Sequence, residues 1–230
     1  MIFTQQEPYV GEKYDGSTLF GARVMVVGAS HYCGEFDCQT KCTPQCKSFG
    51  KYRNSCGQYF GERCERFTVN VIRRYLGNDA SLGDGGWKQT YTKFLKSLFK
   101  NCDASIEDCR KLVEHSVFTE YLQGAEGKDQ SDKNDSLFDA PRHYEALAEK
   151  IQVYRPDVAI VWGCRAWKSI LKFSNGVVLS KNRLEVHIDD CKVKFVTIPH
   201  PAQRNYYSQQ PQSRFVGVGI RLVDRQDKRL

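Results

Sequence analysis

The chain has 230 residues, of which 40% are hydrophobic and 27% are charged, with a formal net charge of +7. This length and apolar content suffice for one sizeable core, so we expect a single α/β domain over residues 1–230. No apolar run approaches membrane-spanning length, which excludes a transmembrane protein, and we expect a soluble, cytoplasmic monomer. The positive charge favours a polyanionic partner without requiring one.

The most informative stretch is residues 23–33, Arg-Val-Met-Val-Val-Gly-Ala-Ser-His-Tyr-Cys. Residues 24–28 do not alternate with polar ones, which is typical of a strand buried on both faces of a parallel sheet. The small residues that follow let the backbone turn tightly, while His31 and Tyr32 can donate, accept or stack. Because ligands bind at the carboxyl ends of strands in open α/β sheets, residues 28–32 are a candidate site, although an ordinary strand and turn would fit the same residues.

Residues 33–64 contain six of the ten cysteines and show no sustained periodicity, so we expect a cysteine-rich loop insertion. Cys33, Cys38, Cys42 and Cys46 have the spacing C-x4-C-x3-C-x3-C, and four sulfurs can converge on one tetrahedral ion that orders the loop. Zinc in a structural role is the favoured ion and an iron–sulfur cluster the less favoured one. Free or partly buried thiols are the alternative to a metal site.

The remaining chain alternates between helical and strand-like patterns. Amphipathic stripes predict helices over residues 65–76, 87–99, 105–115, 144–156, 164–173 and 211–223. Apolar runs predict strands over residues 24–28, 116–118, 157–162, 184–188 and 193–198. Gly77 is suited to end the first helix, and Ser105 with Asp108 resembles a capping box at the start of the third. The polar residues 123–139 are expected to form a surface loop.

Strands that alternate with helices favour a mostly parallel sheet covered on both faces. We therefore predict a three-layer α/β/α sandwich in which residues 24–28, 157–162 and 194–198 are neighbouring core strands. Three strands end in polar or small residues, at 28–32, 119–123 and 199–203. If these ends lie side by side, they share one crevice.

Two of these strand ends resemble the signature motifs of the uracil-DNA glycosylase superfamily. The first strand ends in Gly-x-x-x-Tyr, with Gly28 and Tyr32, and a late strand ends in His200-Pro201. Residues 156–163 are similar to the third strand of that superfamily. The resemblance runs from about residue 24 to the carboxyl terminus, with the cysteine loop as an insertion. It implies a central, mostly parallel four-stranded sheet and a groove across the strand ends that binds single- or double-stranded DNA.

Members of this superfamily flip a damaged or deaminated base out of DNA and hydrolyse its N-glycosidic bond. The resemblance implies that His200 donates to the base oxygen and that Tyr32 closes the pocket. The candidate catalytic residues are His200, Glu120 and Ser30, and the candidate substrate-binding residues are Gly28, Ala29, His31, Tyr32, Gln203 and Arg204. Residues 203–207 have the chemistry to contact phosphates and to wedge into a duplex.

The chain departs from the superfamily pattern at two positions, one where the superfamily has a carboxylate and one where many members have an asparagine. Ser30 occupies the place of the water-positioning carboxylate, and a hydroxyl cannot carry that charge. Glu120 stands where many members have an asparagine that reads the base edge, and an ionised carboxylate only accepts hydrogen bonds. Glu120 is therefore a relocated catalytic group, an altered base reader or a charge at a misaligned position. Two function classes remain open: a DNA glycosylase, and a catalytically silent module that binds nucleic acid or a nucleotide on the same fold.

Overall fold

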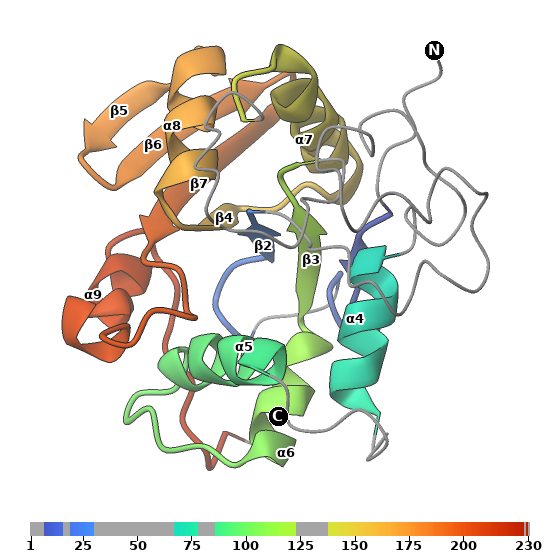
Figure 1. Cartoon of the computed structure of the whole chain (residues 1–230), viewed down its shortest axis with the longest axis vertical. Helices are drawn as coiled ribbons and strands as arrows, with labels where there is room; N and C mark the ends of the chain where they lie inside the picture. The colour runs from blue at the N-terminus through green and yellow to red at the C-terminus, as the bar shows by residue number, and fades with distance from the viewer. Residues whose placement is uncertain are drawn as a thin grey trace, which may run out of the picture.

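The computed structural model of the chain describes residues 7–15, 19–29, 67–77, 86–122, 138–227 and 229. These residues contain one seven-stranded sheet with helices around it (Figure 1). The strands are β1 (Tyr9–Val10), β2 (Val24–Gly28), β3 (Ser116–Glu120), β4 (Val158–Trp162), β5 (Val177–Ser180), β6 (Arg183–Ile188) and β7 (Cys191–Ile198). The helices are α4 (Phe67–Leu76), α5 (Gly86–Ser97), α6 (Ile106–Val113), α7 (Pro141–Tyr154), α8 (Cys164–Phe173) and α9 (Pro211–Val216).

The strand order is β1-β3-β2-β4-β7-β6-β5. The four central strands, β3, β2, β4 and β7, are parallel, whereas β1 pairs with β3, β6 with β7 and β5 with β6 in antiparallel fashion. The prediction that residues 24–28, 157–162 and 194–198 form neighbouring strands is confirmed. The expected total of four strands is wrong, because antiparallel strands extend the parallel centre at both edges.

Successive residues of the central strands point to opposite faces of the sheet, and helices cover both faces. Val24 and Val26 of β2 pack in a core that includes residues of α4, α5, α6 and α9. Met25 and Val27 pack in a second core that includes residues of α7 and α8. Figure 1 shows α5 and α6 below the central strands and α7 and α8 above them. Because β2 is buried on both sides, its sequence contains no polar alternation.

The helix ends agree with the local sequence signals, with one exception. At the start of α6, the Asp108 amide donates to Ser105 Oγ and the Ser105 amide donates to Asp108 Oδ2, both at 3.0 Å, so the predicted capping box is confirmed. The Gly77 amide donates to the Arg73 carbonyl at 2.8 Å and ends α4. The predicted closing helix over residues 211–223 is wrong in its length, because α9 ends at Val216.

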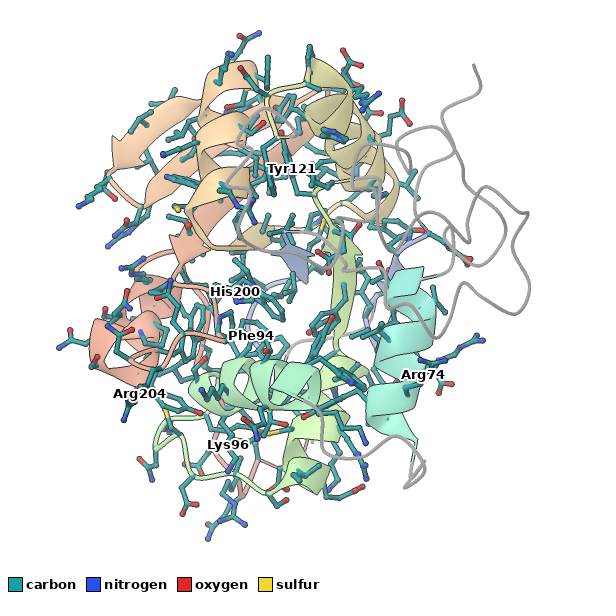
Figure 2. The ribbon with its side chains drawn as sticks, in the orientation of Figure 1. Arg74, Phe94, Lys96, Tyr121, His200 and Arg204 are labelled. Carbon is teal, nitrogen blue, oxygen red and sulfur yellow. The ribbon has the colours of Figure 1, made fainter. Side chains whose placement is uncertain are left out.

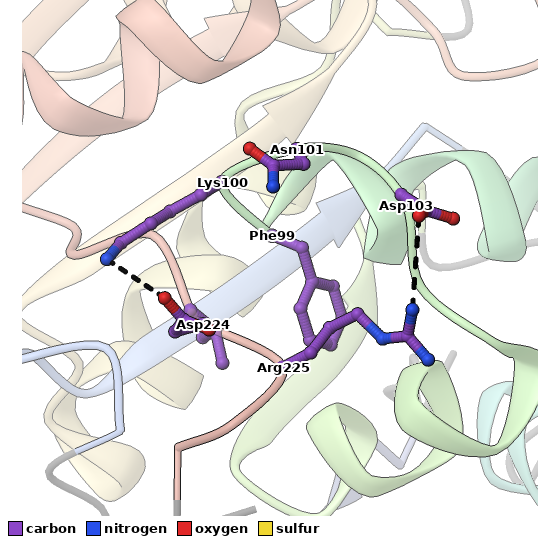
Figure 3. Close-up of a pocket in the computed structure, with 7 residues that line it drawn as sticks. Phe99, Lys100, Asn101, Asp103, Asp224 and Arg225 are labelled. Carbon is purple, nitrogen blue, oxygen red and sulfur yellow. Dashed lines mark hydrogen bonds and ion pairs between the residues drawn. The ribbon is translucent and has the colours of Figure 1, made fainter.

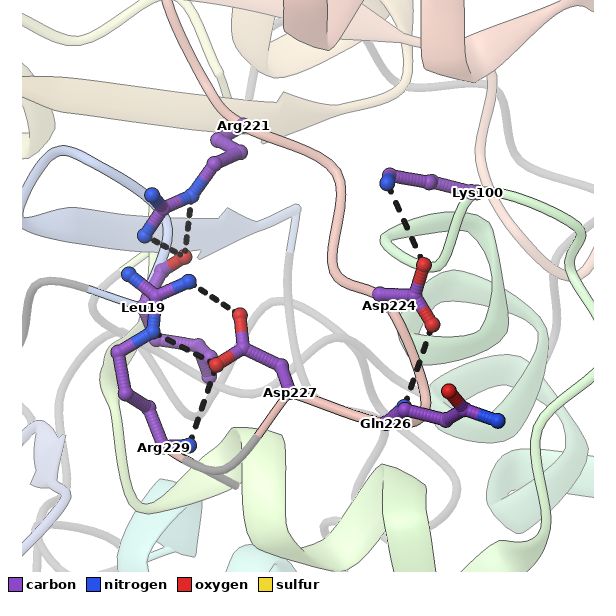
Figure 4. Close-up of polar contacts among 7 residues, drawn as sticks. All are labelled: Leu19, Lys100, Arg221, Asp224, Gln226, Asp227 and Arg229. Atoms are coloured by element: carbon purple, nitrogen blue, oxygen red, sulfur yellow. Dashed lines mark hydrogen bonds and ion pairs between the residues drawn. The ribbon is translucent and has the colours of Figure 1, made fainter.

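The chain after α9 continues as an extended strap that ties distant segments together. The Arg221 amide donates to Phe20 O at 2.8 Å, and its guanidinium donates to Leu19 O at 2.8 and 3.1 Å (Figure 4). The Val223 amide donates to Leu98 O at 2.8 Å, at the end of α5. Val218, Ile220 and Val223 of this strap are buried in the first core without being helical. Among the described residues, no helix is long and apolar enough to cross a membrane.

Candidate functional site

The carboxyl edge of the parallel strands brings together several of the predicted site residues. β3 and β2 are neighbours, and their pairing continues beyond both strands, since the Tyr121 amide donates to Gly28 O at 2.9 Å. β4 lies between β2 and β7, so the chain after β7, which carries His200, is separated from the end of β2 by one strand. The three strand ends share one edge, but they are not all direct neighbours.

Gly28 and Glu120 are opposite each other in the β2–β3 register and lie in direct contact. The Glu120 side chain is buried, with 5% of the residue exposed. A Cβ atom at Gly28 would overlap both carboxylate oxygens of Glu120. The carboxylate therefore occupies the space above Gly28 that any larger residue would need. Glycine is therefore required at position 28 by lack of space and not by a positive φ.

Three aromatic residues, Tyr91 of α5, Phe118 of β3 and Trp162 of β4, form a wall beside this carboxylate. The ring centroid of Tyr91 lies 5.3 Å from that of Trp162 and 6.1 Å from that of Phe118. Burial, together with the negative charge of Glu120, raises the pKa of Tyr91 well above its usual value, so this phenol stays protonated. The apolar stripe of α5 is core packing, as expected from its periodicity.

His200 follows β7 and packs against Trp162 of the same wall. Its ring centroid lies 6.0 Å from that of Trp162, and Phe94 contacts the same indole at 5.0 Å. Figure 2 shows His200 in the middle of the molecule, above α5. A Cβ atom at Gly163 would lie 3.7 Å from His200 Cβ, an ordinary van der Waals contact, so glycine is favoured there by its positive φ of 84° and not by lack of space.

The hydrogen bonding and environment of His200 define its protonation. The Ala202 amide donates to His200 Nδ1 at 3.2 Å, so Nδ1 is an acceptor and the proton of the neutral ring sits on Nε2. Burial, assisted by the positive charge of Arg165, lowers the pKa of His200 to about 4. Near neutral pH the imidazole is therefore uncharged and presents an Nε2–H donor.

The amino terminus of α8 lies next to this histidine. The helix begins at Cys164, directly after β4, with Gly163 as its N-cap at φ 84°. Among the described residues, no side chain caps this end through a hydrogen bond. The first-turn amides and the helix dipole favour an anion there, and Arg165 in the first turn adds a positive charge while its guanidinium packs over the Phe138 ring at 4.7 Å. This edge is suited to a phosphate group, a feature that the sequence analysis did not include.

The loop after His200 differs in part from its expected role. The Gln203 amide donates to His200 O at 2.9 Å, and Gln203 Oε1 accepts from Gln209 Nε2 at 3.0 Å, so this residue shapes the turn. Arg204 is exposed and lies at the outer edge of the molecule beside α9 (Figure 2). Tyr206 is 1% exposed and its hydroxyl lies 2.9 Å from Ser97 Oγ. Tyr206 is therefore part of the core and is not available to enter a duplex, whereas Tyr207 of the same loop is 41% exposed.

Several predicted site residues cannot be compared with the structure. Ser30, His31, Tyr32 and the four proposed metal ligands, Cys33, Cys38, Cys42 and Cys46, lie outside the described residues. Ala29 is described, and its carbonyl accepts from the Leu122 amide at 3.1 Å. In the described ranges, no cluster of His, Cys, Asp and Glu is arranged to hold a metal ion.

Lys150 is a site-proximal residue that sequence reasoning missed. It lies on α7 with 4% of its surface exposed, and its Nζ donates to Thr119 Oγ1 at 3.1 Å, one residue before Glu120. Burial lowers the pKa of Lys150 to about 7, although the charge of Glu120 opposes this shift. A lysine within an amphipathic helix is normally assigned to the exposed face, so no sequence signal indicates its burial.

A small pocket of about 70 Å³ lies elsewhere on the molecule (Figure 3). It is lined by Phe99, Lys100, Asn101, Asp103, Val223, Asp224 and Arg225. Its charged groups pair with one another, with 3.3 Å between Lys100 Nζ and Asp224 Oδ2 and 3.9 Å between Arg225 Nη1 and Asp103 Oδ2. None of the strand-end residues lines it, so it is not part of the candidate site.

No protein-family model matches the chain, and no curated protein is similar to it in sequence. The assignment of a function therefore depends on the motif resemblance and on the geometry of the strand ends.

Proposed function

We propose that the protein is a DNA glycosylase that flips a damaged or deaminated base out of DNA and hydrolyses its N-glycosidic bond. The observation that carries this proposal is the neutral His200, whose Nδ1 accepts the Ala202 amide at the carboxyl edge of the sheet. Cleavage leaves negative charge on the departing base, and an Nε2–H donor held in place stabilises that charge without reorganising. The motif resemblance assigns the same role to this histidine.

The other groups at the strand ends have roles that complete the reaction. Glu120 is the carboxylate that stabilises the cationic sugar or positions water, in place of the acid that Ser30 replaces. Gly28 and Ala29 supply backbone contacts to the flipped base, and Tyr32 and His31 close the pocket. The four parallel central strands and the helices on both faces of the sheet support this proposal, since the three-layer α/β/α sandwich implied by the resemblance needs both.

The positive groups of this edge bind the DNA backbone in the proposed function. In this proposal, phosphates contact the amides at the start of α8, Arg165 and the exposed Arg204. Gln203, which shapes the turn after His200, is a further phosphate contact. We expect affinity for oligonucleotides to fall steeply between about 50 and 200 mM salt, because each neutralised phosphate releases counterions. Fluorescence anisotropy at several salt concentrations measures this slope. Undetectable binding would remove nucleic acid as the partner, and binding that does not depend on salt would remove the proposed phosphate contacts.

The cysteine-rich loop is proposed to hold one structural zinc ion through Cys33, Cys38, Cys42 and Cys46. Protein purified without added metal is expected to contain about one equivalent of zinc by elemental analysis, because thiolates at a closed site retain the ion. A Cys38→Ser variant should lose that zinc, whereas Cys191→Ser, at a cysteine buried in the second core, should retain it. Zinc well below one equivalent in the unaltered protein would contradict the site.

The replacement of the expected carboxylate by Ser30 favours a second candidate, a module that binds DNA without cleaving it. Base release from single- and double-stranded oligonucleotides that carry uracil, hypoxanthine or xanthine separates the two. Release of any of these bases supports the glycosylase. Salt-dependent binding of the same oligonucleotides without release supports the binding module.

A further inference from the structure

The hydroxyl of Tyr91 is a buried polar group that the packing of the fold does not use. Six tyrosines are buried in the part of the chain that the structure describes, and Tyr91 among them is 6% exposed. The other five have a hydroxyl partner at 2.7 to 3.1 Å: Glu114 for Tyr9, the Tyr154 carbonyl for Tyr14, Thr92 for Tyr75, Ser169 for Tyr121 and Ser97 for Tyr206. Within the same residues, the Tyr91 hydroxyl has no hydrogen-bond partner. Because an unpaired buried donor costs stability, ring packing alone does not explain a tyrosine here.

The sheet places this hydroxyl at the strand-end site. Glu120 of β3 and Gly28 of β2 are opposite each other, and Trp162 ends the neighbouring strand β4. The ring of Tyr91 contacts both Phe118 and Trp162, which belong to the strands on either side of β2. The negative charge of Glu120 acts on the Tyr91 hydroxyl. The hydroxyl and the carboxylate therefore belong to the same region at the carboxyl edge of the sheet.

The surroundings of the hydroxyl indicate which kind of ligand atom fits it. Since burial and the charge of Glu120 raise the pKa of Tyr91, the phenol is protonated near neutral pH and is a hydrogen-bond donor. A phosphate oxygen beside Glu120 would bring two negative charges together. A carbonyl oxygen is a neutral acceptor and meets no such repulsion. The carbonyl oxygen of a base therefore fits this donor better than the DNA backbone does.

We propose that Tyr91 is a substrate-binding residue of the strand-end site and that its hydroxyl donates a hydrogen bond to a carbonyl oxygen of the flipped base. This inference rests on the proposed function, because it takes a flipped base as the ligand. It explains why the hydroxyl has no partner within the described fold, since the partner arrives with the base. The helical periodicity of α5 does not distinguish tyrosine from phenylalanine at this position.

Removal of the hydroxyl alone tests the proposal. The probes are single-stranded oligonucleotides that carry one uracil, hypoxanthine or xanthine on a 2′-fluorinated sugar, which resists cleavage. Affinity is measured by fluorescence anisotropy relative to an oligonucleotide of the same sequence with a tetrahydrofuran residue, which has no base. Tyr91→Phe should lower the relative affinity for at least one base about three- to tenfold, as expected for one lost hydrogen bond. It should not lower the urea midpoint, because no hydrogen bond within the fold is lost.

Tyr75→Phe is the matched control. Tyr75 is 3% exposed, its ring centroid lies 5.8 Å from that of Tyr91, and its hydroxyl lies 3.1 Å from Thr92 Oγ1. Because this hydrogen bond is within the fold, Tyr75→Phe should lower the urea midpoint and leave the relative affinity unchanged. That result is the reverse of the one expected for Tyr91→Phe.

Three results would overturn the inference. The first is a Tyr91→Phe protein that keeps its full relative affinity for every base. The second is a loss of stability in Tyr91→Phe as large as that in Tyr75→Phe, which would show that the hydroxyl is bonded within the fold. The third is an unaltered protein that binds none of the probes, which would also remove nucleic acid from the proposed function.

Base release by the unaltered protein, measured on ordinary sugars, separates this inference from the proposed function. If a base is released but Tyr91→Phe keeps its relative affinity, the glycosylase stands and only the role of Tyr91 fails. If Tyr91→Phe loses relative affinity but no base is released, the role of Tyr91 stands and the binding module replaces the glycosylase.

Discussion

Replacement of His200 by alanine is expected to lower the rate of base release about a hundredfold or more and to leave DNA affinity nearly unchanged. In the proposed glycosylase reaction, its Nε2–H donor acts on charge that appears only as the glycosidic bond breaks. Single-turnover kinetics with excess protein measure the chemical step, and anisotropy measures binding. His187→Ala is the matched control, because that side chain is 64% exposed on β6. An unchanged rate in His200→Ala would remove this histidine from the site.

The protonation of His200 adds a second measurement to the same variant. Its folded pKa of about 4 is below the ordinary value of 6.5, because burial opposes the charged form. Between these values the unfolded chain binds a proton at this residue that the folded chain does not, so stability rises with pH across that window. The free energy of unfolding of the unaltered protein should therefore fall more on acidification from pH 6.5 to 4 than that of His200→Ala. Equal pH dependence would contradict a half-buried imidazole that stays neutral in this window.

The sequence predicts the centre of the sheet well because burial on both faces leaves a direct trace. The strands β2 and β4 are continuous apolar runs, and every residue in them is buried. The capping box of α6 is similarly local, since it needs only Ser105 and Asp108 three residues apart. Such features require no knowledge of distant parts of the chain.

The missed features depend on contacts between distant segments. β1 has two residues and exists through pairing with β3, and β5 exists through pairing with β6. The spacing of Val216, Ile220 and Val223 suits a helix, but the helix ends at Val216 and the strap that follows is fixed by hydrogen bonds to distant segments. Buried Tyr206 lies in a polar loop, and only its contact with Ser97 shows that it belongs to the core.

The candidate site also combines features that the local sequence indicates with features that depend on contacts between distant segments. The resemblance identifies His200 and Glu120 as site residues. The tautomer of His200, however, is fixed by the backbone amide of Ala202, and the identity of that residue gives no indication of this hydrogen bond. The contact between Glu120 and Gly28 is set by the β2–β3 register, which unites residues far apart in sequence. Sequence therefore names the groups, and the sheet determines which of them touch.

Gly28→Ala is expected to lower the free energy of unfolding by about 1 to 3 kcal/mol, because the new methyl group and the Glu120 carboxylate would occupy the same space. Urea denaturation measures the loss. In a Glu120→Ala background the same substitution should cost much less, since the carboxylate is gone. Gly77→Ala is the control for the loss of a glycine alone, because its Cβ atom would make a tight contact of 3.3 Å with Arg73 O, not the 2.3 Å overlap that Glu120 Oε2 makes at Gly28. Strictly additive costs would show that Gly28 and Glu120 do not touch.

A substitution at Glu120 tests whether its carboxylate has a catalytic role or only a structural one. Glu120→Gln keeps the shape of the side chain above Gly28 but removes its negative charge. If that charge stabilises the cationic sugar, base release should fall about a hundredfold while the urea midpoint changes little. If the carboxylate only fills space, the rate should stay within a few-fold of the unaltered protein. In that case Glu120 does not replace the acid missing at Ser30, and the transition state depends on the donor of His200 for its electrostatic stabilisation.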